Sequence, residues 1–266
     1  MSSSLIIGQY VPGRSIVHRL DPRTKITIIF FFVFIVFFAN TWPSYSILTV
    51  FALLSMFATR IKIRFILKGL TPIWFLIAFT FLLHLFVTKE GPILFEVFSI
   101  KVHLGGIMQG FAISMRFFLL ILVTSLLTLT TTPIEITDAI EDMLHPLKKI
   151  RFPVHELALM MSISLRFIPT LMQETGKISN AQASRGVDFK TGPLKERLKA
   201  VVPLLVPLFV SAFKRAEELA MAMEARGYRG GEGRTKLREL KLQKRDAFIF
   251  ILFIAVVTGL FLMRDY

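Results

Sequence analysis

The sequence predicts an all-α fold: a polytopic membrane helix bundle of about five spans, with a cytoplasmic α-helical module inserted before the last span. Three observations support this prediction. Hydrophobic residues fill 54% of the 266 positions and charged residues only 19%, whereas soluble domains average about 25% charged residues. Most of the 32 Lys and Arg residues lie between long uncharged segments, each close to the roughly 20 residues that a spanning helix needs. These uncharged segments are 26–59, 69–88, 117–134 and 247–263.

The first domain, residues 1–132, is predicted to hold about four spans. Its first uncharged segment is interrupted at 40–43 by Asn-Thr-Trp-Pro, in which Asn and Pro favour a turn and Trp favours the membrane interface. We therefore expect two short spans joined by a tight turn, with a re-entrant pair as the alternative. The four spans are expected at about 25–41, 44–59, 69–88 and 105–131.

Residues 133–246 form the inserted module, and residues 247–266 form the C-terminal transmembrane helix. The module is predicted to contain three helices, which begin near residues 133, 153 and 194. The third helix has an uncharged stretch, 200–213, that is short for a span and is flanked by Lys and Arg, so we expect it to lie along the membrane or against another hydrophobic protein. From the end of this stretch onward, three alanines of the same helix repeat every four residues, a spacing that lets helix backbones approach closely. They are Ala212, Ala216 and Ala220.

The distribution of Lys and Arg sets the predicted orientation. These residues concentrate before the first span, between the second and third spans, and throughout the inserted module. The positive-inside rule therefore places the N-terminus and the module in the cytoplasm of a multi-pass cell-membrane protein. This topology also accounts for the net charge of +14, and no aromatic and basic recognition module points to a nucleic-acid partner.

Motifs for catalysis are sparse. The chain has no cysteine and no Gly-x-x-x-x-Gly-Lys-Ser/Thr loop, and His155-Glu156 is followed by Leu at 159 rather than the His of a metal motif. We therefore expect no catalytic residue, metal or cofactor in this chain. His84 and Arg116 are predicted to lie within spans, where ionisable residues favour a functional role. Local pairing of Arg116 is the simpler alternative.

Two further alternatives stay open on the sequence alone. One is a membrane-embedded enzyme on phospholipid or prenyl substrates, in which Asp138, Glu141 and Asp142 would hold a metal and a phosphate. A solvated helix face accounts for the same three residues. The other is a self-sufficient channel or secondary transporter, for which the chain offers few intramembrane charges or broken helices.

The most informative feature is duplicated. Ala-Ser-Arg-Gly at 183–186 and Ala-Arg-Gly at 225–227 each end a long predicted helix. Glycine after a helix favours the left-handed conformation and arginine complements the negative helix end, so ordinary helix termination explains either motif alone. Together, the two motifs predict two protruding helix ends. Each would offer a permanently charged guanidinium to an acidic groove on one half of a dimeric partner.

These motifs give the chain a specific resemblance. They occur together with Gly-Gln-Tyr-Val-Pro-Gly-Arg-Ser at 8–15, His-Arg-Leu-Asp-Pro-Arg-Thr-Lys at 18–25 and Ala-Met-Glu-Ala-Arg-Gly-Tyr at 222–228. With these residues the chain resembles, from end to end, the transmembrane (T) component of energy-coupling factor (ECF) transporters, the EcfT/CbiQ family.

The resemblance implies a non-catalytic energy-coupling subunit of an ECF-type ABC importer for vitamins or other micronutrients. It implies two ABC ATPase subunits, identical or different, which bind ATP and Mg, and a small membrane substrate-binding (S) subunit. ATP-driven motion would pass from the ATPases through the inserted module, here the coupling module, to the S subunit. In this family each motif's arginine inserts into a groove of one ATPase, and the extra serine in the first motif would make the two grooves non-equivalent. The matching positions are Ala183, Ser184, Arg185, Gly186, Ala225, Arg226 and Gly227.

Overall fold

The computed structural model describes residues 10–69, 71–97, 100–187, 193–230 and 240–263. The first two residues of the 8–15 segment lie outside these ranges, as does most of the connection before the predicted third helix of the module. The chain divides into two units, of which the second comprises 140–239 and the first comprises the remainder. The sequence prediction put these boundaries at 132/133 and 246/247. In the structure, residues 133–139 and 240–246 of this predicted module belong to the first unit.

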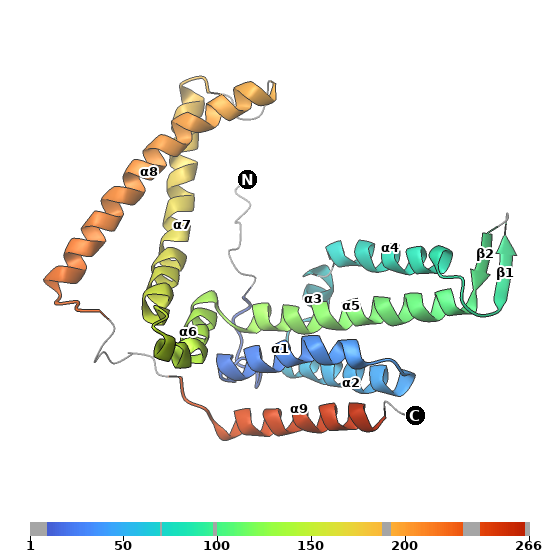
Figure 1. Ribbon diagram of the computed structural model, residues 1–266. Coiled ribbons are helices and arrows are strands. Elements are labelled where there is room, and N and C mark those ends of the chain that lie inside the picture. The colour runs from blue at the N-terminus through green and yellow to red at the C-terminus, as the bar shows by residue number, and fades with distance from the viewer. Residues whose placement is uncertain (1–9, 70, 98–99, 188–192, 231–239, 264–266) are drawn as a thin grey trace. The chain divides into compact units, whose positions relative to one another are not determined.

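The first unit contains six helices and one β-hairpin among its described residues (Figure 1). The hairpin and a short helix lie in segments that the sequence analysis treated as loops. The elements are α1 (Pro22–Phe38), α2 (Trp42–Thr59), α3 (Ile63–Gly69), α4 (Thr71–Val87), β1 (Ile93–Val97), β2 (Ile100–His103), α5 (Leu104–Thr130) and α9 (Lys244–Leu262).

The first two helices lie close to the predicted spans, although α1 begins and ends three residues earlier than 25–41 and α2 begins two residues earlier than 44–59. The Asp21 carboxylate caps α1 by accepting a hydrogen bond from the Arg23 amide at 2.9 Å, and Pro22 follows at the first helical position, where no amide donor is needed. Helix α1 stops before Ala39, and α2 begins after an extended Thr41. The expected turn at 40–43 is therefore a break over residues 39–41, and positions 42 and 43 already belong to α2.

Helix α5 lies at the centre of the first unit. It contacts α1, α2 and α4, while α9 contacts α1 and α2. Each of four helices contributes at least one fully buried large side chain to the core: Phe32, Leu48, Leu119 and Leu260. Helix α4 approaches α5 closely at Gly106, where an added Cβ atom would lie 2.9 Å from the His84 carbonyl oxygen. A side chain at position 106 would therefore force these two helices apart.

The first turn of α1 is tied to the start of α9 by buried polar groups. The Asp21 amide donates to Oδ1 of Asp246 at 2.8 Å, and Oδ2 of Asp246 accepts from the Gln243 amide at 2.8 Å, which caps α9. Arg23 bridges the Asp21 carboxylate at 2.9 Å and the Leu240 carbonyl at 3.1 Å. Burial opposes ionisation of Asp21, but its hydrogen bonds with Arg23 and the nearby positive charges outweigh burial, so the pKa of this carboxyl lies below its ordinary value.

The same turn of α1 holds the end of α5. The Lys25 ammonium donates to the Thr130 carbonyl and to the Thr131 hydroxyl, both at 3.1 Å. Lys25 is buried, and a cation at the carboxyl end of a helix complements the helix dipole. Residues 21–25 thus contact both the segment that leads out of α5 and the segment that leads into α9.

The second unit consists of two long helices and the short elements before them. Helix α6 (Pro133–Leu144) crosses the boundary between the units, and a 3₁₀ helix (His145–Ile150) follows it. Helices α7 (Val154–Ser184) and α8 (Leu194–Ala225) make up the rest of the described part. Their bounds agree closely with the predicted helices.

Several helices are suited to a lipid environment. Among the described residues, α2, α5, α7 and α9 are long and apolar enough to cross a membrane. Helices α1 and α4, of 17 residues each, cover the two other predicted spans, and many phenylalanines on the first unit are exposed. The protein is therefore a polytopic helical membrane protein, as predicted. Helix α7 meets the same criterion of length and composition, although the sequence prediction places it in the cytoplasm.

Candidate functional site: two arginine-capped helix ends

Helix α7 ends in a closed backbone motif around Arg185. Arg185 is the C-cap residue, and Gly186 adopts the left-handed conformation with φ of 88°. The Gly186 amide donates to the Ala183 carbonyl and the Val187 amide to the Gln182 carbonyl, both at 3.0 Å. These two bonds define a Schellman motif, which satisfies carbonyl groups that the last helical turn leaves open.

Helix α8 ends in the same way around Arg226. Gly227 has φ of 74°, and its amide donates to the Glu224 carbonyl at 2.8 Å. The Tyr228 amide donates to the Met223 carbonyl at 3.0 Å. This end is therefore a second Schellman motif with arginine at the C-cap and glycine directly after it.

The two ends correspond residue by residue. Arg185 and Arg226 have nearly identical backbone angles, with φ of −89° and −88° and ψ of 6° in both. Ser184 consequently occupies the position of Ala225. The expectation that the serine is an extra residue in the first motif is wrong, because the arginines and glycines of both motifs are already in register without it. The serine is a substitution in the last helical turn, where its hydroxyl donates to the Asn180 carbonyl at 3.1 Å.

Both arginine side chains are exposed and available to another protein. Neither Arg185 nor Arg226 forms a hydrogen bond or ion pair through its guanidinium with any residue that the structure describes. The space beside the following glycines is open, since an added Cβ atom on Gly186 or Gly227 would meet no atom within 4 Å. Each end thus presents a planar cation with five donors, which suits carboxylate or carbonyl acceptors.

The two helices are antiparallel and bonded to each other. The ribbons of α7 and α8 run in opposite directions (Figure 1). Glu174 of α7 accepts from the Ser211 hydroxyl at 2.6 Å and from Arg215 at 2.9 Å, and the Gln182 amide donates to the Pro203 carbonyl at 3.4 Å. Rising numbers on α8 therefore face falling numbers on α7. At about 1.5 Å per residue, the length of α8 beyond Pro203 places the two arginine ends on the order of 30 Å apart.

The alanine repeat does not form this crossing. Ala216 and Ala220 are exposed, and Ala212 is half-buried. The polar contacts of Glu174 and Gln182 join the helices instead. The prediction that helix backbones pack through the alanines is therefore wrong within this chain.

Apolar side chains at several places along α7 and α8 are largely uncovered. Within the predicted apolar stretch of α8, Phe209 is 60% exposed and Val210 is 64% exposed. Met160 and Met161 of α7 and Met221 of α8 are also exposed. These residues do not form a closed core within the chain, so the surface they make is available to lipid or to a partner.

Acidic residues on α6 do not form a recognisable catalytic site. Asp138, Glu141 and Asp142 are half-buried, and Oε1 of Glu141 lies 3.3 Å from Nδ1 of His155. Nε2 of His155 lies 3.4 Å from the Tyr228 hydroxyl, which links the start of α7 to the residue after the second motif. Among the described residues, no group of three or more His, Cys, Asp or Glu side chains could hold a metal ion.

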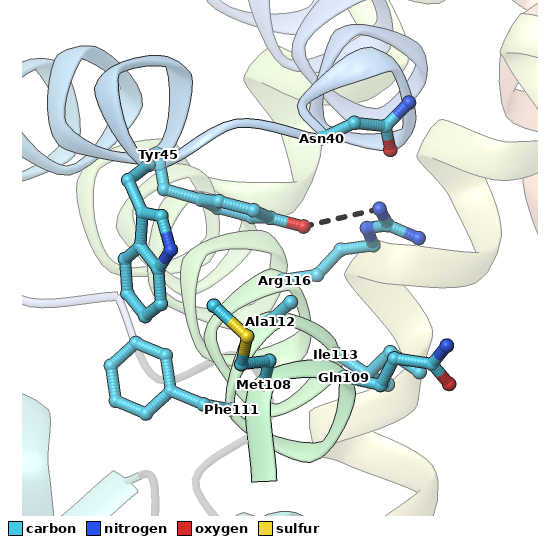
Figure 2. A pocket seen from close by; sticks show the side chains of 9 residues that line it. Asn40, Tyr45, Met108, Gln109, Phe111, Ala112, Ile113 and Arg116 are labelled. Carbon is cyan, nitrogen blue, oxygen red and sulfur yellow. Dashed lines mark hydrogen bonds between the residues drawn. The ribbon is translucent and has the colours of Figure 1, made fainter. Parts of the chain in front are cut away.

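The two intramembrane candidates lie in different places. Nη2 of Arg116 donates to the Ala39 carbonyl at 3.2 Å and to the Tyr45 hydroxyl at 3.1 Å, so Arg116 is locally paired (Figure 2). His84 lies where α4 meets α5, with its Cβ atom near Gly110 and its Nδ1 buried without a described partner. The structure does not bring these two side chains into one described cluster.

The sequence analysis missed the buried cluster around Asp21, Lys25 and Asp246. Its N-terminal half falls in the 18–25 segment, which drew attention only as part of a family pattern. A buried Lys and two buried Asp residues are unusual, since charged groups are rarely buried without partners. Their proximity to long apolar segments was the available signal, but the contacts that join Asp21 to Asp246 and Lys25 to α5 link residues more than 100 positions apart.

Comparison with known proteins identifies the family of the chain. The profile of the CbiQ family, described as cobalt transport protein, matches residues 13–237. The energy-coupling factor transporter transmembrane protein EcfT of Bacillus subtilis strain 168 is 61% identical over 99% of this chain and 100% of its own length. The EcfT proteins of Exiguobacterium sibiricum and Macrococcus caseolyticus are 53% and 49% identical, over 95% and 100% of this chain and 96% and 100% of their own lengths. These relatives are named as transmembrane proteins of energy-coupling factor transporters, and these names give the enzyme alternative no support. The chain therefore belongs to the CbiQ/EcfT family of energy-coupling factor transporter transmembrane proteins.

Proposed function

We propose that the two arginine-capped ends of α7 and α8 are the docking points for two ABC ATPase subunits of an importer. The observation that carries this proposal is the equivalence of the two ends: the same cap position, the same glycine conformation and the same pair of backbone bonds. Helix termination alone requires no such identity, because arginine is not needed at a C-cap. Two copies of one docking element suit two copies of one type of partner.

The antiparallel α7–α8 pair connects these docking points. ATP and Mg bind to the two ATPases, which are identical or different, and closure of the nucleotide-bound dimer shifts the helix ends that they hold. The bonds of Glu174 with Ser211 and Arg215 join the two helices, so a force on one end is resisted by the other helix. The pair thereby converts ATPase closure into a movement of its apolar faces.

Those exposed apolar faces are the proposed contact for a small membrane S subunit. Phe209, Val210 and the neighbouring methionines are large, uncovered and deformable, which suits a partner that changes orientation during transport. The S subunit would carry the selectivity for cargo, in the class of vitamins or other micronutrients. In this arrangement the N-terminus and the second unit lie in the cytoplasm, consistent with their concentration of Lys and Arg.

Charge reversal at the two caps tests the proposal. The full chain is co-expressed with its neighbouring ATPase and S subunits as wild type, Arg185→Glu, Arg226→Glu and the double variant. Each single change should reduce co-purification of the ATPases, and the double change should abolish both co-purification and substrate uptake, with membrane insertion intact. Arg166→Glu is the matched control, because Arg166 is an exposed arginine in the interior of α7. ATPase yields at the wild-type level with the double variant would overturn the assignment.

A further inference from the structure

A cavity in the first unit is lined by the connection between α1 and α2, the start of α2 and one face of α5. Its volume is about 420 Å³, within the range of roughly 300–1,000 Å³ typical of small-molecule sites. Figure 2 shows the Arg116 side chain beside Tyr45 and Asn40, with Met108 and Phe111 on the neighbouring wall. The cavity thus combines one permanent cation with polar groups and an apolar wall.

The bonds of Arg116 use only part of its capacity to donate. Both described hydrogen bonds come from Nη2, to the Ala39 carbonyl and the Tyr45 hydroxyl. Nε is buried without a partner, and Nη1 has none among the described residues. The guanidinium carbon also lies 5.3 Å from the centre of the Phe37 ring, at the distance of a cation–π contact.

No described carboxylate neutralises this cation. None of the ion pairs among the described residues includes Arg116. The carboxylate of Glu90 accepts a hydrogen bond at 2.8 Å from the side-chain amide of Gln109, which lines the cavity. A charged group in an apolar helix bundle is unfavourable without a counter-charge. The cavity is therefore electrostatically incomplete, and an anion would complete it.

The surroundings of the cavity point to the source of that anion. Trp42 is 55% exposed at the start of α2, its ring lies 5.4 Å from that of Phe111, and Phe38 nearby is also exposed. Tryptophan beside a helix end is typical of the depth at which lipid headgroups lie. An exposed aromatic surface at this depth faces phospholipid, in which phosphate groups and acyl chains occur on one molecule.

We propose that this cavity binds the headgroup of an acidic phospholipid, with Arg116 contacting the phosphodiester. The apolar wall of Met108 and Phe111 would accommodate the glycerol and the first part of an acyl chain. This lipid would link the α1–α2 turn to α5, because Arg116 on α5 already holds both sides of that turn. The proposal concerns the membrane bundle alone and does not depend on the docking of the ATPases.

Native mass spectrometry of the full chain in mild detergent tests the site. The protein is titrated with phosphatidylglycerol, with phosphatidylcholine and with inorganic phosphate. Wild type should retain one more phosphatidylglycerol than Arg116→Gln and should bind this lipid at least fivefold more tightly than phosphatidylcholine. Arg64→Gln is the matched control, because Arg64 is exposed on α3 outside the cavity, and it should behave as wild type.

A second variant separates binding from folding. Ala112→Leu adds volume at the cavity wall and leaves the guanidinium in place, so it should lose the retained lipid even where Arg116→Gln is poorly folded. Phosphatidylglycerol should raise the melting temperature of wild type and Arg64→Gln, but not of Ala112→Leu. Equal retention by wild type and both cavity variants would overturn the proposal. Displacement of the lipid by millimolar inorganic phosphate would show a site for a free anion and would overturn the assignment to lipid.

Discussion

The side-chain carboxylate of Asp246 accepts a hydrogen bond from the backbone amide of Asp21 at 2.8 Å. The two residues lie near opposite ends of the sequence, and both are almost fully buried, with 3% and 6% of their surfaces exposed. Because the other oxygen of Asp246 caps α9, one carboxylate both starts that helix and holds it against α1.

Removal of this carboxylate is expected to destabilise the membrane bundle. Asp246→Ala leaves the amides of Asp21 and Gln243 without their acceptor, and hydrogen bonds to charged groups contribute about 1.5–3 kcal/mol each. We expect a loss of about 3 kcal/mol, measured as a lower melting temperature in mild detergent. Arg245→Ala, an exposed neighbour, is the control and should melt with wild type. Equal melting temperatures for the two variants would contradict this role of Asp246.

Close packing of α4 on α5 predicts a contrast between two glycines of the same unit. Gly106→Ala places a methyl group 2.9 Å from the His84 carbonyl oxygen and should cost about 1–3 kcal/mol through displaced helices. Gly259→Ala meets its nearest side-chain atom, on Ile47, at 3.8 Å, an ordinary contact, and should be neutral or stabilising. Thermal unfolding of both variants in the same detergent measures the difference. A stable Gly106→Ala protein would show that α4 and α5 can separate freely.

Replacement by alanine should destabilise the protein at the left-handed glycine after each arginine, but should stabilise it at a glycine inside α7. Gly186→Ala and Gly227→Ala should each cost about 1 kcal/mol, because alanine disfavours a positive φ. Gly176→Ala should stabilise by about 0.5–1 kcal/mol, since this glycine lies in the helix interior with open space around it. Urea-induced loss of the helical circular dichroism signal compares the three variants. A cost at position 176 equal to that at 186 would argue against the cap conformation.

The ion pair across α7 and α8 predicts a measurable coupling. Glu174 and Arg215 are partly exposed, so a double-mutant cycle with Glu174→Ala and Arg215→Ala should give a coupling free energy of about 0.5–1 kcal/mol. The matched cycle pairs Glu218→Ala with Arg215→Ala, because Glu218 is exposed on α8 and does not form this ion pair. Its coupling should be smaller. Additive effects of Glu174 and Arg215 would mean that the contact does not stabilise the crossing.

Much of the helical organisation could be predicted from the sequence. Helix α6 begins with a proline, and α7 and α8 begin directly after one. The ends of α7 and α8 carry Arg-Gly, so local chemistry sets both boundaries of these two helices. The identical conformation of the two Arg-Gly ends could not be inferred from the sequence alone. It required the backbone bonds, which align the arginines and turn the supposed extra serine into a substitution.

Other features depended on partners that a single sequence does not reveal. The alanine repeat on α8 was compatible with helix packing, but spacing cannot say which face a neighbouring helix covers. Lys25 bonds to Thr130 and Thr131 across more than 100 positions, a relation that no local pattern contains. The sequence analysis missed the hairpin β1–β2 because its strands have only five and four residues. They lie between two long apolar helices, whose composition hides the pattern of so short a segment.

The first turn of α1 has a consequence for how this family can vary. Lys25 forms a hydrogen bond with Thr131, and Arg23 forms one with Leu240. Both ends of the segment 131–240 are therefore bonded to the first turn of α1. We expect changes in the length of this segment to leave these contacts intact, because both of its anchor points belong to the membrane bundle. The contacts that hold the bundle together would then be independent of the length of the second unit.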